Sequence, residues 1–263
     1  MLSLEKELKT FKFEAYIKLL KWLKKRYRII TFSEVTDKSS SFLLLRHDVD
    51  ASMKAALKMA RMERRLGIRS TYLVMFSNKL YNIMEKDNLE ALKDLAKLGH
   101  EIGLHYDLPT YEKRGRDLSE ILETEIALLE RLIGKKVNSI APHNVSTLTG
   151  EDPFKNMAEY INVYSPRFHQ NYVSDSCRAW YPRPLRELLA FKYEKVQVLV
   201  HPFLWTRDEC ELKDVLEMLL RDIADENKLY VQRWLELLDD TAKRRLEDGK
   251  KNDIHSYSQI KKY

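Results

Sequence analysis

Residues 43–52 read LLLRHDVDAS: three leucines run without a break into Arg46, His47, Asp48 and Asp50. A short apolar run of this kind is typical of a buried strand. Such a strand rarely ends in four ionisable groups, because a charge that leaves water without a partner is costly. The pattern therefore predicts a strand whose carboxyl end carries a functional site.

Strand-like and helical patterns alternate after this first strand. Strands are expected at 70–76, 100–106, 137–143, 160–166, 171–176 and 196–202, and helices at 52–66, 86–98, 118–133 and 184–193. A glycine follows each of the first three helices, where a helix commonly stops. The alternation predicts right-handed βαβ units and a parallel sheet. Seven such strands suit either an open doubly wound sheet or a closed barrel.

The segments that flank this α/β region have helical patterns of their own. Apolar residues at helical spacing predict one amphipathic helix over 4–26. The segment from 207 to about 248 is helix-rich and strongly charged, and a polar tail follows. We therefore expect a helical segment over 1–40 that packs on an α/β unit over 41–206, and a helical C-terminal extension with a polar tail over 207–263.

The composition of the 263 residues, with 44% hydrophobic and 33% charged residues, is that of an ordinary globular protein. The net charge is +6, but basic and acidic residues are interspersed, which indicates solvated helix faces rather than a nucleic-acid site. No apolar stretch reaches the ~18 residues of a membrane span, and the N-terminus does not resemble a signal peptide. Two cysteines fit a reducing compartment, so we expect a cytoplasmic protein. The oligomeric state is left open.

Ionisable residues stand at the ends of several predicted strands. His105, His143 and His201 stand at the ends of three different strands, and Asp175 stands at the end of a fourth. Parallel α/β folds place their sites at the carboxyl ends of strands, so these side chains are expected to converge. Alternation along the first strand puts Arg46, Asp48 and Asp50 on one face, and His47 on the other.

This set of residue types suits metal-assisted hydrolysis. One carboxylate and two imidazoles can hold Zn²⁺ with a position left open, while a second carboxylate acts as base and a further histidine as acid. Structural roles are the alternative for each residue alone. Asp50 could cap the helix that begins near Ser52, and His105 could be a core histidine. His143 could make a hydrogen bond in a loop, and His201 could simply end its strand. We expect His100 to be structural.

Two motifs resemble the polysaccharide deacetylases of carbohydrate esterase family 4: LLLRHDVD, and LGHEIGLHYD about 50 residues later. The resemblance covers roughly 42–205 and implies an irregular (β/α)7 barrel, here with an extra N-terminal helix and a helical C-terminal extension. It also implies that Asp48 is the catalytic base, that Asp50 and His105 bind the metal, and that His201 protonates the leaving amine.

The second metal histidine of that family usually lies four residues after the first, and this chain has Pro109 there. Proline cannot bind a metal. His143, from the next strand, would complete an Asp50–His105–His143 set for one divalent ion, with Zn²⁺ expected, and Asp107 is an alternative third ligand. Loss of the metal, which would leave a barrel that binds without hydrolysing, is the other outcome.

Other residues are expected to support the site. Arg178, Trp180 and Tyr106 could line a sugar pocket, through an arginine fork and aromatic faces, or could serve packing alone. Arg46 and Asp175 are expected in supporting positions, with Asp175 orienting His201 or His143.

The sequence thus predicts a cytoplasmic, metal-dependent deacetylase that removes an N-acetyl or other acyl group from an amino-sugar-containing glycan or glycan precursor. Its expected partner is that small glycan, with no nucleic acid and no membrane. One alternative is a catalytically silent barrel that binds carbohydrate or acts as a scaffold. Another is a related metal-dependent hydrolase of a linear amide.

Overall fold

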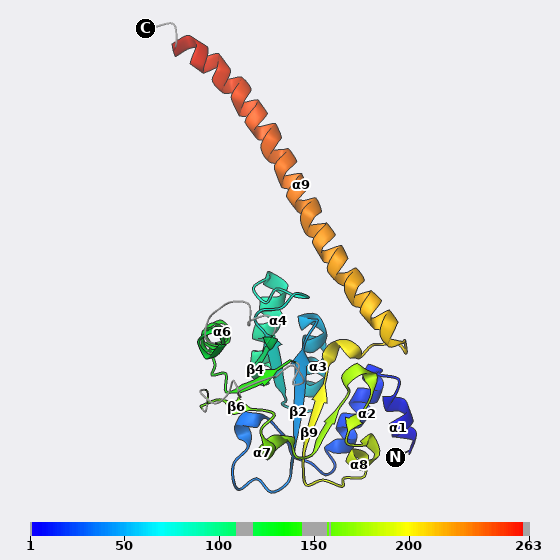
Figure 1. The fold of residues 1–263 in the computed structure, drawn as a ribbon. Helices are drawn as coiled ribbons and strands as arrows, with labels where there is room; N and C mark the ends of the chain where they lie inside the picture. The colour runs from blue at the N-terminus through cyan, green and yellow to red at the C-terminus, as the bar shows by residue number, and fades with distance from the viewer. Residues whose placement is uncertain (1, 109–117, 144–156, 158, 260–263) are drawn as a thin grey trace. The chain divides into compact units, whose positions relative to one another are not determined.

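The computed structural model in Figure 1 describes residues 2–108, 118–143, 157 and 159–259. The chain divides into two compact units, Met1–Val215 and Leu216–Tyr263. All the strands lie in the first unit. They are β1 (Ile29–Ile30), β2 (Phe42–Val49), β3 (Thr71–Met75), β4 (Glu101–Tyr106), β5 (Ser139–Pro142), β6 (Ile161–Asn162), β7 (Tyr172–Ser174), β8 (Tyr181–Pro182) and β9 (Lys195–Val200).

The sheet is built around parallel strands in the order β6-β5-β4-β3-β2-β9-β7. These are the seven strands that the sequence predicts, and they confirm the irregular (β/α)7 fold. The short β8 adds an antiparallel edge to β7, and β1 pairs with β2. Among the described residues no ladder joins β6 to β7, so the sheet stays open there.

The register of the parallel ladders aligns the carboxyl ends of neighbouring strands. Asp48 pairs with Leu73 across β2 and β3, and Met75 pairs with His105 across β3 and β4. A close approach of strands makes room for glycine alone at Gly103, because a Cβ there would lie 2.6 Å from the Ser139 carbonyl oxygen. The parallel register therefore brings the carboxyl ends of β2, β3 and β4 to one edge of the sheet.

The helices of the first unit cover the sheet (Figure 1). They are α1 (Leu2–Leu8), α2 (Phe13–Leu23), α3 (Met53–Arg65), α4 (Lys86–Lys97), α6 (Leu118–Ile133), α7 (Pro166–His169) and α8 (Leu185–Leu189), with short 3-10 turns at η1 (Phe32–Glu34), η4 (Ser176–Arg178) and η5 (Pro202–Leu204). Gly67, Gly99 and Gly134 end α3, α4 and α6 with φ of 68°, 91° and 68°, as the sequence predicts.

The expectation of a single helix over 4–26 is wrong. The chain breaks between α1 and α2 at Phe11, whose φ is 53°. There the Phe11 carbonyl accepts a hydrogen bond from the Thr206 amide, and the Phe13 amide donates to the Thr206 carbonyl. Pairing with the segment after β9 thus replaces helical hydrogen bonds at this point.

The two faces of β2 pack into different layers. Phe42 and Leu44 lie in an apolar cluster with Leu73 and Ala141, on the same face as Arg46 and Asp48. Leu43 and Leu45 lie in a second cluster, with Tyr16 and the other buried side chains of α1 and α2, which pack on β9 and α8. We call these the inner and outer faces of β2.

Helix α9 (Leu212–Gln259) is 48 residues long and makes up most of the second unit. It continues past the point near 248 where the polar tail was expected to begin. No helix in the described ranges has the length and hydropathy needed to cross a bilayer.

Candidate active site

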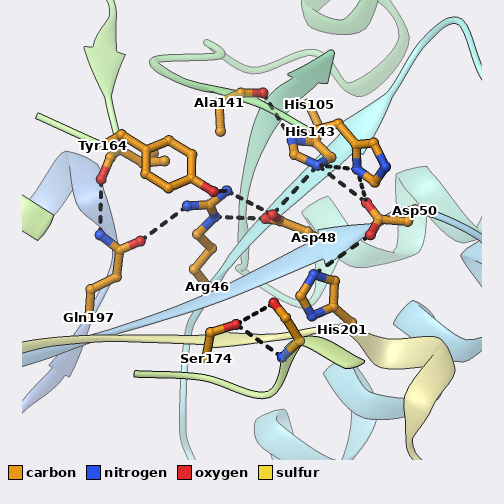
Figure 2. A network of polar contacts seen from close by, with 12 residues as sticks. Arg46, Asp48, Asp50, His105, Ala141, His143, Tyr164, Ser174, Gln197 and His201 are labelled. Atoms are coloured by element: carbon orange, nitrogen blue, oxygen red, sulfur yellow. Dashed lines mark hydrogen bonds and ion pairs between the residues drawn. The ribbon is translucent and has the colours of Figure 1, made fainter. Parts of the chain in front are cut away.

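Four of the predicted site residues converge at the carboxyl edge of the sheet (Figure 2). Asp50 follows β2, His105 lies near the end of β4, and His143 and His201 directly follow β5 and β9. Ser52, whose Oγ accepts a hydrogen bond from the Ala55 amide, caps α3, so Asp50 is left for another role.

Three donor atoms in this cluster form a nearly equilateral triangle. Asp50 Oδ1 lies 3.2 Å from His105 Nε2 and 3.2 Å from His143 Nδ1, and the two nitrogens are 3.3 Å apart. Among the described residues, these three are the group that could hold a metal ion. Asp107, the alternative third ligand, is not in that group.

The donor set fits a zinc ion by two tests. Zinc–ligand bonds of about 2.0–2.1 Å in a tetrahedron place neighbouring ligand atoms about 3.3 Å apart, which the triangle reproduces. In addition, Asp50 Oδ1 is buried without a hydrogen bond, although two imidazole nitrogens lie beside it. His105 Nδ1 lies 2.9 Å from the Ala141 carbonyl oxygen, a contact that directs its Nε2 toward the triangle.

Asp48 lies beside this triangle and is held by Arg46. Arg46 donates from Nε to Asp48 Oδ1 and from Nη2 to Oδ2, both at 2.7 Å, and neither side chain is more than 2% exposed. Burial raises the pKa of Asp48, but the charges of Arg46, His105 and His201 together outweigh burial, and the pKa is lowered. Asp48 is therefore an anion, and its Oδ2 lies 3.5 Å from His105 Nε2.

Two residues that the sequence analysis missed hold Arg46 in place (Figure 2). Arg46 donates to Gln197 Oε1 at 3.2 Å and to the Tyr164 hydroxyl at 3.1 Å, and its guanidinium lies 4.4 Å from the centre of the Tyr164 ring. Gln197 had a signal, since it is a polar residue inside the apolar run of β9. Tyr164 had none, because it follows β6 in an irregular segment.

Asp175 pairs with His201, one of the two histidines that it was predicted to orient. His201 Nδ1 lies 2.7 Å from Asp175 Oδ1, and Trp205 Nε1 donates to Asp175 Oδ2 at 2.8 Å. Burial lowers the pKa of His201, but the hydrogen bond and charge of Asp175, together with the charges of Asp50 and Asp48, raise that pKa to about 9. His201 is thus a cation at neutral pH, with Nε2 3.7 Å from Asp50 Oδ2.

The three residues predicted to line a sugar pocket make packing contacts in the described structure. Tyr106 is fully buried in an apolar cluster. Arg178 donates to the Thr10 carbonyl at 2.9 Å and lies over the Phe11 ring, on which Trp180 also stacks. Their substrate-binding role remains a prediction, and Pro109 lies outside the described residues.

No family model matches this chain, and no curated protein matches it. Solved structures that match include the polysaccharide deacetylase Bc1974 from Bacillus cereus, with 12% identity over 71% of this chain and 89% of that chain and a TM-score of 0.43. The chitin deacetylase from Colletotrichum lindemuthianum matches with 15% identity over 74% of this chain and 86% of that chain, at a TM-score of 0.41.

A pseudoenzyme of the same carbohydrate esterase family, BA3943 from Bacillus anthracis, matches with 12% identity over 71% of this chain and 62% of that chain, at a TM-score of 0.40. The family that the two motifs resemble thus recurs among the matching structures. At these identities and TM-scores, the matches support no conclusion about the activity of this chain.

Proposed function

We propose that this protein is a metal-dependent hydrolase that removes an acyl group, with N-acetyl expected, from an amino-sugar-containing glycan or glycan precursor. The observation that carries the proposal is the arrangement around Asp50. A triangle of metal-binding atoms is flanked by an anionic carboxylate on one side and a cationic imidazole on the other.

The ion would be held by Asp50, His105 and His143, and Zn²⁺ suits this donor set best. When bound, such an ion supplies Lewis acidity, which lowers the pKa of a coordinated water and polarises a carbonyl. His143 is the only ligand with a substantially exposed side chain, at 38%, so the site is open on its side.

Asp48 is the proton acceptor in this proposal. Arg46 binds both of its carboxylate oxygens, which keeps the carboxylate anionic and fixes its orientation. In this proposal Oδ2, which lies 3.5 Å from His105 Nε2, is the oxygen that takes the proton. The lowered pKa makes Asp48 a weak base that stays anionic at neutral pH.

His201 is the proton donor to the departing amine. Asp175 occupies Nδ1, so the proton that His201 can give is carried on Nε2, which points toward Asp50. With a pKa of about 9, His201 holds that proton at neutral pH, and Asp175 stabilises the cation until the proton is transferred.

The substrate class rests on the resemblance of the two motifs, and the cytoplasmic location rests on the two free cysteines, Cys177 and Cys210. The alternative is a barrel that binds carbohydrate without hydrolysing it. Pro109, at the place of a family metal ligand, favours this alternative.

The test is metal content by elemental analysis of the purified protein and its variants, followed by a deacetylase assay on acetylated sugars. We expect about one divalent ion per chain, lost in His105→Ala and His143→Ala and kept in the control His169→Ala. Asp48→Asn should keep the ion and lose turnover by at least about 10³-fold. A protein that takes up no ion even from a zinc solution would make the non-hydrolysing barrel the better conclusion.

A further inference from the structure

Helix α9 carries an apolar stripe along the second unit. At about 100° per residue, nine apolar side chains fall within one sector of about 120° around the helix axis. They are Leu216, Leu219, Leu220, Ile223, Tyr230, Val231, Trp234, Leu237 and Leu238. The side opposite is mostly charged. The helix is therefore amphipathic over residues 216–238.

The stripe is exposed. Leu220, Tyr230, Trp234 and Leu237 expose 61%, 71%, 56% and 65% of their surface. Contiguous apolar surface of this kind on a soluble unit indicates an interaction site. Long helices also gain most of their stability from burying such a face, rather than from helix propensity.

Charge along the helix is unequal. Residues 216–226 hold four acidic and one basic residue, a net charge of −3, whereas residues 228–238 hold one acidic and two basic residues, a net charge of +1. Two parallel copies would place like charges together at both ends. Two antiparallel copies would place the acidic half of each beside the basic half of the other, which is favourable.

The apolar positions have the symmetry that an antiparallel pair needs. Counted from Asn227, Leu216 and Leu238 are equally distant, as are Leu220 and Trp234. In a two-fold symmetric pair, a residue i that contacts residue j implies that j contacts i, so equidistant apolar positions face each other. Asn227 would lie at the two-fold axis.

We propose that α9 is the dimerisation element of this protein and pairs antiparallel with α9 of a second copy. The stripe is about 35 Å long. A standard stable interface buries about 800 Å² per partner, and the nine apolar side chains along this length are the surface that a second copy would cover. A second copy thus fits the stripe in length, charge and pattern.

The first test is the mass of the full chain in solution by sedimentation or light scattering. We expect twice the chain mass of 31.3 kDa for the wild type, and the chain mass alone for Leu237→Asp. The matched control is Leu229→Asp, because Leu229 is 48% exposed but lies off the stripe. A wild type that is monomeric in solution overturns the proposal, even if it sediments with phosphatidylserine vesicles. Equal disruption of the dimer by Leu237→Asp and Leu229→Asp overturns it too.

The second test determines the orientation, in a background with Cys177→Ser and Cys210→Ser. Chains that carry Leu216→Cys are mixed with chains that carry Leu238→Cys and oxidised. An antiparallel pair gives the mixed disulfide and little cross-linking of either variant alone. Efficient cross-linking of Leu216→Cys with itself indicates a parallel pair and contradicts the proposal.

Discussion

Strand β2 carries a buried carboxylate cluster beside each of its faces, and the two clusters differ in how their oxygens are satisfied. On the inner face, Asp50 Oδ1 is buried and accepts no hydrogen bond. On the outer face, Glu63 of α3 is fully buried, yet its oxygens accept hydrogen bonds from the Tyr16 and Ser70 hydroxyls, and its Oε1 lies 2.7 Å from His47 Nε2.

This difference separates a binding site from a structural cluster. A buried polar atom without a partner costs free energy, so it persists where a ligand completes it. Glu63 instead ties α3 to α2 through Tyr16 and to β2 through His47. His47 Nδ1 has no hydrogen-bond partner, so the outer cluster leaves one ring nitrogen unsatisfied while both oxygens of its carboxylate are satisfied. The outer cluster therefore holds the N-terminal helices on the sheet.

The largest expected effect is on stability, from Glu63→Gln. His47 lowers the pKa of Glu63 to about 2 even though burial opposes this, so the anion contributes to folding. We expect a loss of about 3 kcal/mol in the free energy of unfolding, measured by urea denaturation, with the bound metal retained. The exposed control Glu90→Gln should change stability by less than about 0.5 kcal/mol. Loss of the ion in Glu63→Gln would show that the two clusters are not separate.

The same carboxylate predicts a pH dependence. The pKa of Glu63 is lowered from 4.5 in the unfolded chain to about 2 in the folded protein. Its contribution is therefore complete above pH ~4.5 and is lost as the pH falls toward 2. The stability difference between wild type and Glu63→Gln should narrow over this range in urea titrations at each pH. A difference that stays constant would mean that the charge of Glu63 does not contribute.

On the inner face, Asp50→Asn should weaken zinc binding by about 100-fold or more, measured by competition with a chelator. The amide removes the anionic donor from the triangle but keeps its shape. The metal-free variant should lose less stability than Glu63→Gln, because Asp50 Oδ1 has only its 3.2 Å contacts with His105 and His143, whereas Glu63 also accepts hydrogen bonds from two hydroxyls. A variant with unchanged zinc affinity would place the ion elsewhere.

Much of the inner face could be predicted from the sequence, because alternation and strand ends are local patterns. Asp48 and Asp50 share a side by spacing, and a parallel sheet brings His105 and His201 to the same edge. The outer cluster could not be predicted in this way. Tyr16 and Glu63 are 47 residues apart on two helices, and only the packing of α2 against α3 brings them together. The break at Phe11 was missed for the same reason, since its cause is Thr206.

Asp175→Asn should move the pH dependence of turnover. Asp175, together with Asp50 and Asp48, raises the pKa of His201 to about 9, so the proton-donating form persists to that pH. Without the carboxylate, the pKa should fall toward its usual value near 6.5, and the alkaline limb of the pH–rate profile should shift down by about 1 to 2 units. The exposed control Asp37→Asn should leave the limb unchanged. A limb that does not move in Asp175→Asn would assign the proton donor to another group.

The smallest effect is expected from Tyr16→Phe, which removes one hydrogen bond to Glu63 and leaves His47 in place. We expect a loss of about 1–2 kcal/mol by urea denaturation, with zinc affinity and turnover unchanged. Tyr181→Phe, at an exposed position, is the control. Because Tyr16 is the only described α2 side chain that reaches Glu63, its effect measures how much of the attachment of α2 is polar. A loss as large as that of Glu63→Gln would mean that the cluster acts as one unit. No loss would assign that attachment to the apolar contacts alone.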